Sequence, residues 1–169
     1  MKPGMLVSAY AILHAAACAT SAVSFVADGV EYSRRTCLGD STLVEAQREW
    51  RCVDASGALN GPVMQWIDDD IVVYTEYLHG SRSGRYLQWR SDGTLFARGE
   101  FKDGLPSGKW EVFHGNGRLR CEGRFDAGKR VGVWTLVDRS GSLRTVDVER
   151  ATIGGPDEVC PIPDPSQPS

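Results

Sequence analysis

The sequence lacks the short motifs that commonly mark an enzyme. It contains no G-x-S-x-G nucleophile elbow, no H-E-x-x-H zinc motif and no phosphate-binding P-loop. It has no C-x-x-C pair, and its three histidines, His14, His79 and His114, lie far apart along the chain. Neither His79 nor His114 has a carboxylate or serine partner at a matching offset. We therefore expect no metal site, no cofactor, no small-molecule substrate and no enzymatic activity.

Long apolar runs and a strong charge of one sign are also missing. After the amino terminus, no stretch is apolar for long enough to cross a bilayer. The net charge of −3 favours no particular class of partner. The acidic run Asp68–Asp70 lacks the spaced ligands and the glycine of a calcium-binding loop, so we expect a polar turn between two strands there.

The amino terminus has the pattern of a secretory signal. Lys2 precedes an apolar run over residues 5–19, and small residues follow it. The alternative is a buried amino-terminal helix. Ordinary cleavage would follow Ala19 or Ala22. The letters A-A-A-C also resemble a bacterial lipobox, in which Cys18 would carry lipid, although leucine usually stands at the first of these positions. Either cleavage predicts export, which disfavours nucleic acid as a partner.

Both cleavage options leave four cysteines in the mature chain: Cys37, Cys52, Cys121 and Cys160. An even number in an exported protein suggests disulfides. We predict a bridge between Cys37 and Cys52, since closing so short a loop is worth about 3 kcal/mol in the chain-entropy model. Cys121 has two interpretations of equal weight. It either pairs with Cys160 and pins the tail, or it is a small buried thiol at the position that Ala97 occupies one unit earlier.

A repeat of about 24 residues runs through the second half of the chain. It is clearest when four glycines, spaced 23, 24 and 24 residues apart, are taken as its origin: Gly61, Gly84, Gly108 and Gly132. Two residues after an origin stand Tyr86, Trp110 and Trp134. The first unit is degenerate and the last loses its second half, as is usual for the terminal repeats of an array.

Each unit reads as a β-hairpin. Asn116-Gly117 is a strong hairpin-turn signal, and the strand after the turn alternates between apolar and charged residues. One face of that strand is predicted to carry Leu95, Ala97, Gly99 and Phe101. We expect Gly99 and Gly123 to leave room for an aromatic ring, from Trp110 or Trp134. The prediction is an all-β protein, an elongated antiparallel meander of stacked β-hairpins with little or no helix.

The pattern G-x-W-x-x-F-x-x-x-G-x-L, continuing to G-x-F-x-x-G, resembles the bacterial variant of the MORN repeat. The resemblance covers about residues 57–143 and implies a β-hairpin repeat fold. Some bacterial members are described as antitoxin-like, and eukaryotic relatives imply roles in protein assembly and phospholipid association. A cysteine-flanked segment followed by such repeats also resembles repeat lipoproteins of Gram-negative bacteria, which implies a periplasmic, outer-membrane-anchored or extracellular location.

Four segments follow from these patterns. We predict a signal peptide over residues 1–22, a disulfide-tied amino-terminal cap over residues 23–56, and the hairpin repeats over residues 57–150. The remainder, residues 151–169, is rich in proline and is predicted to be an extended, disordered tail.

Charge provides the best indication of a binding surface. Between Arg82 and Arg130 there are eleven Lys or Arg residues against six Asp or Glu. Four of them are predicted to share the outward face of adjacent strands: Arg98, Arg118, Arg120 and Arg124. Such a patch would suit anionic lipid headgroups or an acidic protein surface. The alternative is a solvated face balanced by Glu100, Glu122 and Asp126 through weak cross-strand ion pairs.

Four functions can be considered, three from these features and one from the resemblance. The first is a non-enzymatic module for protein–protein interaction or scaffolding outside the cytoplasm, with an unknown protein partner. The second is a peripheral module on a membrane surface with anionic lipid, and the resemblance adds an antitoxin-like or immunity-type binding protein. The third, an enzyme with its site in residues 23–56, is disfavoured because that segment has no histidine and only ordinary acids.

Overall fold

The fold is taken from a computed structural model that describes residues 25–27, 30–32, 37, 39–67, 71–150 and 160–162. The predicted signal peptide with its lipobox cysteine, Cys18, lies outside the described residues. The predicted turn at Asp68–Asp70 and most of the proline-rich tail lie outside them as well.

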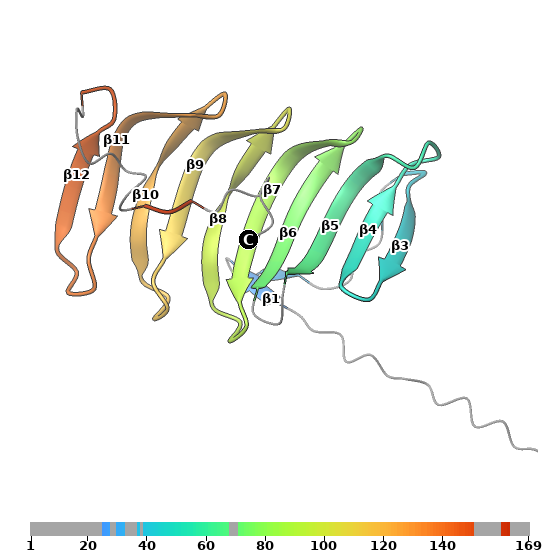
Figure 1. The fold of residues 1–169 in the computed structure, drawn as a ribbon, viewed down its shortest axis with the longest axis horizontal. Coiled ribbons are helices and arrows are strands. Elements are labelled where there is room, and N and C mark those ends of the chain that lie inside the picture. Colours follow the sequence, from blue (N-terminus) through green and yellow to red (C-terminus); the bar gives the residue numbers. More distant parts are fainter. Residues whose placement is uncertain are drawn as a thin grey trace, which may run out of the picture.

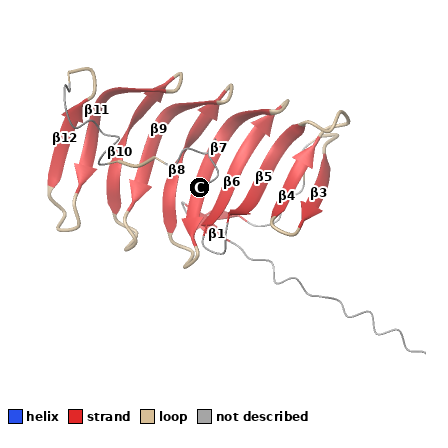
Figure 2. Ribbon diagram, in the orientation of Figure 1, coloured by secondary structure: helices blue, strands red, loops and turns tan. Residues whose placement is uncertain are grey.

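Ten antiparallel strands form one sheet in which every strand pairs with its neighbours in sequence (Figure 1). The strands are β3 (Thr42–Ala46), β4 (Glu49–Val53), β5 (Leu59–Ile67), β6 (Ile71–Leu78), β7 (Ser81–Arg90), β8 (Leu95–Lys102), β9 (Leu105–Phe113), β10 (Leu119–Asp126), β11 (Lys129–Val137) and β12 (Leu143–Asp147). A separate two-stranded sheet contains β1 (Phe25–Ala27) and β2 (Val30–Tyr32). No helix occurs among the described residues (Figure 2). The predicted all-β meander is confirmed, and the segment predicted as a cap supplies β3 and β4 as its first two strands.

Between β6 and β12, two kinds of connection alternate along the sheet. On the edge that we call the turn edge, uppermost in Figure 1, the connections are the two-residue turns His79-Gly80, Asp103-Gly104 and Ala127-Gly128. Both residues of each turn have positive φ, which defines the type I′ hairpin turn. On the opposite edge, which we call the loop edge, the loops are longer and comprise residues 91–94, 114–118 and 138–142.

Asn116-Gly117 lies at the loop edge, so the predicted hairpin is present but its turn type differs. The loop joins Phe113 to Leu119, and in it only Gly117 has positive φ. The Asn116 side chain accepts a hydrogen bond from the amide of Arg118. The two-residue turns lie at the turn edge instead. The register of the strands decides which connection is shortest, and the dipeptide Asn116-Gly117 does not determine that register.

The four origin glycines of the repeat stand in β-bulges. Their φ values are 114°, 115°, 67° and 66° for Gly61, Gly84, Gly108 and Gly132. At the third glycine, Arg98 pairs with Glu111 but Glu100 pairs with Ser107, so β9 contains two more residues than β8 over this stretch. A positive φ is easy for glycine and strained for other residues, and this explains why glycine returns at this position in each unit.

One face of the sheet, which we call the aromatic face, carries a continuous row of rings. Its rings are Tyr86, Phe101, Trp110, Phe125 and Trp134, and successive ring centroids lie 5.4–5.8 Å apart, mostly edge to face. A Cβ atom built on Gly99 would lie 2.2 Å from the Trp110 ring, and one on Gly123 would lie 2.1 Å from Trp134. The predicted role of both glycines is therefore confirmed, and the row of rings joins one unit to the next.

The face opposite the aromatic face is apolar only in the amino-terminal half of the sheet. There it carries a second cluster of buried side chains: Trp50, Met64, Val72, Tyr74, Leu87 and Trp89. The aromatic face is buried in this half as well, by Val63, Val73 and Thr75. In the carboxy-terminal half that opposite face becomes charged, because Arg98, Glu111 and Glu122 follow Leu87 in cross-strand register. We call this carboxy-terminal half of the opposite face the polar face.

A second type of bulge corrects one predicted face assignment. Gln88 pairs with Ala97 and Trp89 with Leu95, so Phe96 is an extra residue in β8. Leu95 accordingly packs with the amino-terminal cluster, whereas Ala97 belongs to the cluster of the aromatic face. The sequence alternation had placed both residues on one face, and an extra residue reverses the alternation.

Candidate binding surface

The polar face holds Arg98 in an ion-pair network rather than as a free cation. The Arg98 guanidinium lies 2.5 Å from the Glu111 carboxylate, and their side chains are 29% and 13% exposed. Lys109 Nζ lies 3.0 Å from Glu111 and 2.8 Å from Glu122. Glu111 was not among the acids that the sequence suggested as partners. Its position opposite Arg98 depends on the bulge at Gly108, which the sequence pattern alone does not fix.

The contacts within this network shift the pKa values of Glu111 and Lys109. Burial raises the pKa of Glu111, but hydrogen bonds from Arg98 and Lys109 outweigh it and hold that pKa below its ordinary value. Hydrogen bonds to Glu122 and Glu111 raise the pKa of Lys109. Arg98, Lys109 and Glu111 thus remain charged at neutral pH. An anionic ligand would have to compete with the carboxylates of Glu111 and Glu122 for the two cations.

The other three predicted arginines are divided between this face and the loop edge. Arg124 is exposed on β10, in register with Lys109 of the polar face. Arg118 is the last residue of the loop before β10, and Arg120 is the extra residue of a bulge between Leu119 and Cys121. The structure therefore places Arg98 and Arg124 together and brings Arg118 and Arg120 to a different part of the molecule.

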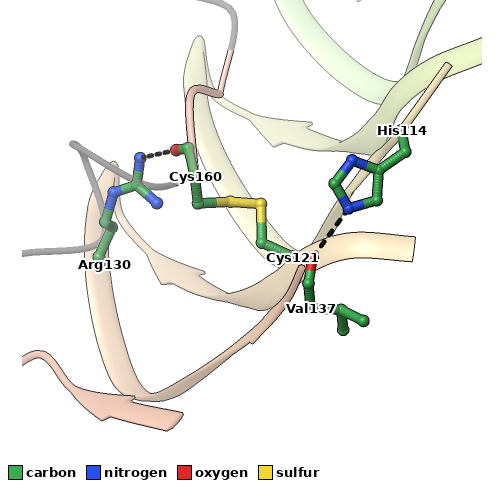
Figure 3. Close-up of a disulfide and its surroundings, with 5 residues drawn as sticks. All are labelled: His114, Cys121, Arg130, Val137 and Cys160. Carbon is green, nitrogen blue, oxygen red and sulfur yellow. Dashed lines mark hydrogen bonds between the residues drawn. A yellow bond between two sulfur atoms is a disulfide. The ribbon is translucent and has the colours of Figure 1, made fainter. Parts of the chain in front are cut away.

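At the loop edge, side chains fasten one unit to the next. Arg90 Nη2 donates a 2.7 Å hydrogen bond to the Phe113 carbonyl oxygen, and its guanidinium lies 4.7 Å from the centroid of the Phe96 ring. One unit later, His114 Nε2 lies 2.8 Å from the Val137 carbonyl oxygen (Figure 3). Arg90 and His114 therefore have structural contacts at equivalent positions of the repeat. The sequence had not singled out Arg90.

Two disulfides join residues outside the strands to β4 and to β10. Cys37 is bonded to Cys52, which confirms the predicted bridge. Cys121 is bonded to Cys160, which decides between the two interpretations of Cys121 (Figure 3). Arg130 Nη2 donates a hydrogen bond of 3.1 Å to the Cys160 carbonyl oxygen. Two disulfides in a domain of this size are typical of a protein that folds in an oxidising compartment.

The disulfide holds part of the tail on the aromatic face. Cys160 is fully buried, and Ile162 packs against the same cluster of buried side chains. The short red segment in Figure 1 marks these residues. The prediction of a disordered tail therefore does not hold for residues 160–162, because the disulfide fixes them. The remaining tail residues lie outside the described part of the chain.

The described residues contain no group of three or more His, Cys, Asp or Glu side chains that could bind a metal ion. Among them there is also no helix long and apolar enough to cross a membrane.

Comparison with known proteins gives a likeness to solved structures only. No protein-family model matches the chain, and no curated protein matches its sequence. Two solved structures resemble part of the fold: TarM, and a point mutant of S. aureus TarM in complex with fondaparinux, alpha-GlcNAc-glycerol and UDP. Each has a TM-score of 0.42 and 11% sequence identity, over 63% of this chain and 21% of that chain. The chain therefore spans about a fifth of the length of these proteins.

Proposed function

We propose that this protein is a non-enzymatic, MORN-type repeat module that is exported from the cytoplasm and docks a partner protein. The observation that carries the proposal is the row of rings from Tyr86 to Trp134, which locks the stacked hairpins into one sheet. A sheet that is ordered before binding presents its surface without paying the entropy of folding on contact. A rigid surface of this kind suits recognition of another macromolecule.

Export is supported by two independent features. The amino terminus has the pattern of a secretory signal, with the alternative of lipid on Cys18. The disulfides Cys37–Cys52 and Cys121–Cys160 are stable where the environment is oxidising. We place the mature protein in the periplasm, on the outer membrane or outside the cell.

The proposal is tested by capturing a partner and then reconstituting the complex. The oxidised, folded protein is immobilised and exposed to the extracytoplasmic fraction of its host, beside a Gly99→Leu variant in which the ring of Trp110 has no place. We expect the folded protein to retain a protein that the variant does not, and the purified pair to form a saturable complex by calorimetry. If the folded protein and the disrupted variant retain the same proteins, the docking role is wrong.

A further inference from the structure

Arginine is concentrated at the part of the loop edge between β7 and β12. Five arginines lie in its loops or within two strand residues of them: Arg90, Arg118, Arg120, Arg139 and Arg144. Only two acids, Asp92 and Asp138, occupy the same stretches. Counted in the same way, the turn edge carries Arg82, Lys102, Lys129 and Arg130 against Asp103 and Asp126. Its two arginines are engaged with rings, since the Arg82 guanidinium lies 5.4 Å from the Phe101 ring centroid and that of Arg130 lies 4.3 Å from the Trp134 ring centroid.

Both acids of the loop edge are committed to their own loops. Asp92 Oδ1 accepts hydrogen bonds from the amide and the hydroxyl of Thr94. Asp138 Oδ1 accepts bonds from the amides of Ser140, Gly141 and Ser142 and from the Ser140 hydroxyl. These carboxylates are directed into the loops, so they neutralise the arginines only from a distance.

The side chain of Arg118 extends beyond its own loop. A Cβ atom on Gly141 would lie 2.8 Å from Arg118 Nη2, so Arg118 reaches from its own loop to the next loop of the edge. Burial lowers the pKa of Arg90, Asp92 opposes this, and the positive charge of Arg120 lowers that pKa further. An anion at this edge would therefore meet several positive charges at once.

The spacing of the loops defines the shape of a suitable anion. Successive loops on this edge are two strands apart, which is about 10 Å. An extended peptide advances about 3.3 Å per residue, so every third residue of such a peptide meets a new loop. The loops contain small polar residues such as Ser91, Asn116 and Ser140 and no large apolar residue. Leu143 follows the last loop and is exposed, but one leucine is a small apolar area for insertion into a bilayer.

We propose that the loop edge binds an extended acidic segment of the partner protein, with one carboxylate pairing with Arg118 and another, about three residues along the segment, pairing with Arg139 and Arg144 at the next loop. This inference rests on the proposed docking function and adds the surface and the chemistry of the partner. Arg118, Arg139 and Arg144 are all exposed. Arg90 is left out of the contact because its guanidinium already binds the main chain of β9.

The test uses a fluorescent peptide of six Glu-Ser-Gly repeats, with the Gln-Ser-Gly peptide as its neutral control. The full mature chain is compared with a triple variant, Arg118→Gln, Arg139→Gln and Arg144→Gln. A matched variant loses three cations elsewhere, by Lys102→Gln, Arg124→Gln and Lys129→Gln. We expect the triple variant to bind the acidic peptide roughly tenfold more weakly, because exposed ion pairs contribute less than a factor of ten each. The matched variant should bind like the wild-type chain, and added salt should weaken binding.

Three outcomes would overturn the assignment. In the first, both variants lose the same affinity, so the peptide responds to net charge alone. In the second, vesicles that contain anionic phospholipid bind through these arginines while the peptide does not, so the edge recognises lipid. In the third, the partner captured by the folded protein binds the triple variant unchanged. That third outcome leaves the docking function standing, whereas failure of the folded protein to capture any partner would count against the docking function itself.

Discussion

At the scale of single residues, two glycines make the stacking of the units possible. Trp110 lies over Gly99 and Trp134 over Gly123, at distances where no Cβ atom fits. We expect Gly99→Ala and Gly123→Ala each to lower the free energy of unfolding by about 1–3 kcal/mol, because the ring must move out of a close-packed site. Denaturant unfolding of the purified variants measures this.

Gly115 provides the matched control for that prediction. It is exposed, and a Cβ atom built on it meets nothing within 4 Å. Gly115→Ala should therefore leave the free energy of unfolding almost unchanged. Equal destabilisation by all three substitutions would mean that backbone freedom, rather than the space under the rings, explains the glycines.

One residue of the turn edge has a strained backbone conformation. Ala127 has a φ of 44°, in the left-handed region that a Cβ atom disfavours. The equivalent turns have His79 and Asp103 there. We expect Ala127→Asn to raise the free energy of unfolding by about 0.5–1 kcal/mol, because asparagine tolerates this conformation. Asp103→Asn is the control and should change stability little, and a loss of stability in Ala127→Asn would contradict the argument.

At the scale of the element, the repeat predicts the hairpins but not their bulges. The period and the alternation of β8 and β10 were enough to predict antiparallel hairpins, the aromatic face and the space at Gly99. They were not enough to place Leu95 or Arg120, because a one-residue bulge reverses the alternation within a strand. The partner of Arg98 was missed for a related reason, since the bulge at Gly108 sets which acid stands opposite it.

The aspartates of the loops predict how the stability of the fold depends on pH. The pKa of Asp92 is lowered chiefly by the hydrogen bond from the Thr94 side chain, and that of Asp138 by the one from Ser140. A carboxylate whose folded-state pKa is lowered stabilises the fold above its unfolded pKa, and this stabilisation is lost as the pH falls through the folded-state value. We therefore expect the melting temperature to fall as the pH drops below about 4.

Replacing the two acids tests their share in that fall. In Asp92→Asn with Asp138→Asn the decline of melting temperature between pH 5 and pH 2 should be shallower than in the wild-type chain. Asp126→Asn with Asp103→Asn, at the turn edge, removes the same charge without touching these loops. A decline as steep in the loop variant as in the wild type would show that the loop hydrogen bonds do not couple to protonation.

At the scale of the whole molecule, the second disulfide joins the carboxy-terminal tail to β10, the third strand from one end of the sheet. Cys121 and Cys160 are separated by 39 residues, and in the chain-entropy model closing such a loop is worth about 4 kcal/mol. We expect Cys121→Ala with Cys160→Ser to lower the free energy of unfolding by up to that amount. The sheet itself should persist by circular dichroism, since its strands pair without the tail.

The repeat also predicts which unit of the molecule is dispensable. Deleting residues 108–131 joins Ser107 to Gly132, keeps the strand alternation and brings Trp134 over Gly99, where the ring has room. Deleting residues 84–107 removes the same length. It puts Trp110 at the place of Tyr86, where the paired residue on the preceding strand is Thr75 and not a glycine. We expect the first deletion, made with Cys160→Ser, to unfold cooperatively with a β-rich spectrum, and the second to be much less stable, because Thr75 has a side chain where the ring must lie. Equal stability of the two deletions would mean that the hairpins stack without the glycine under each ring.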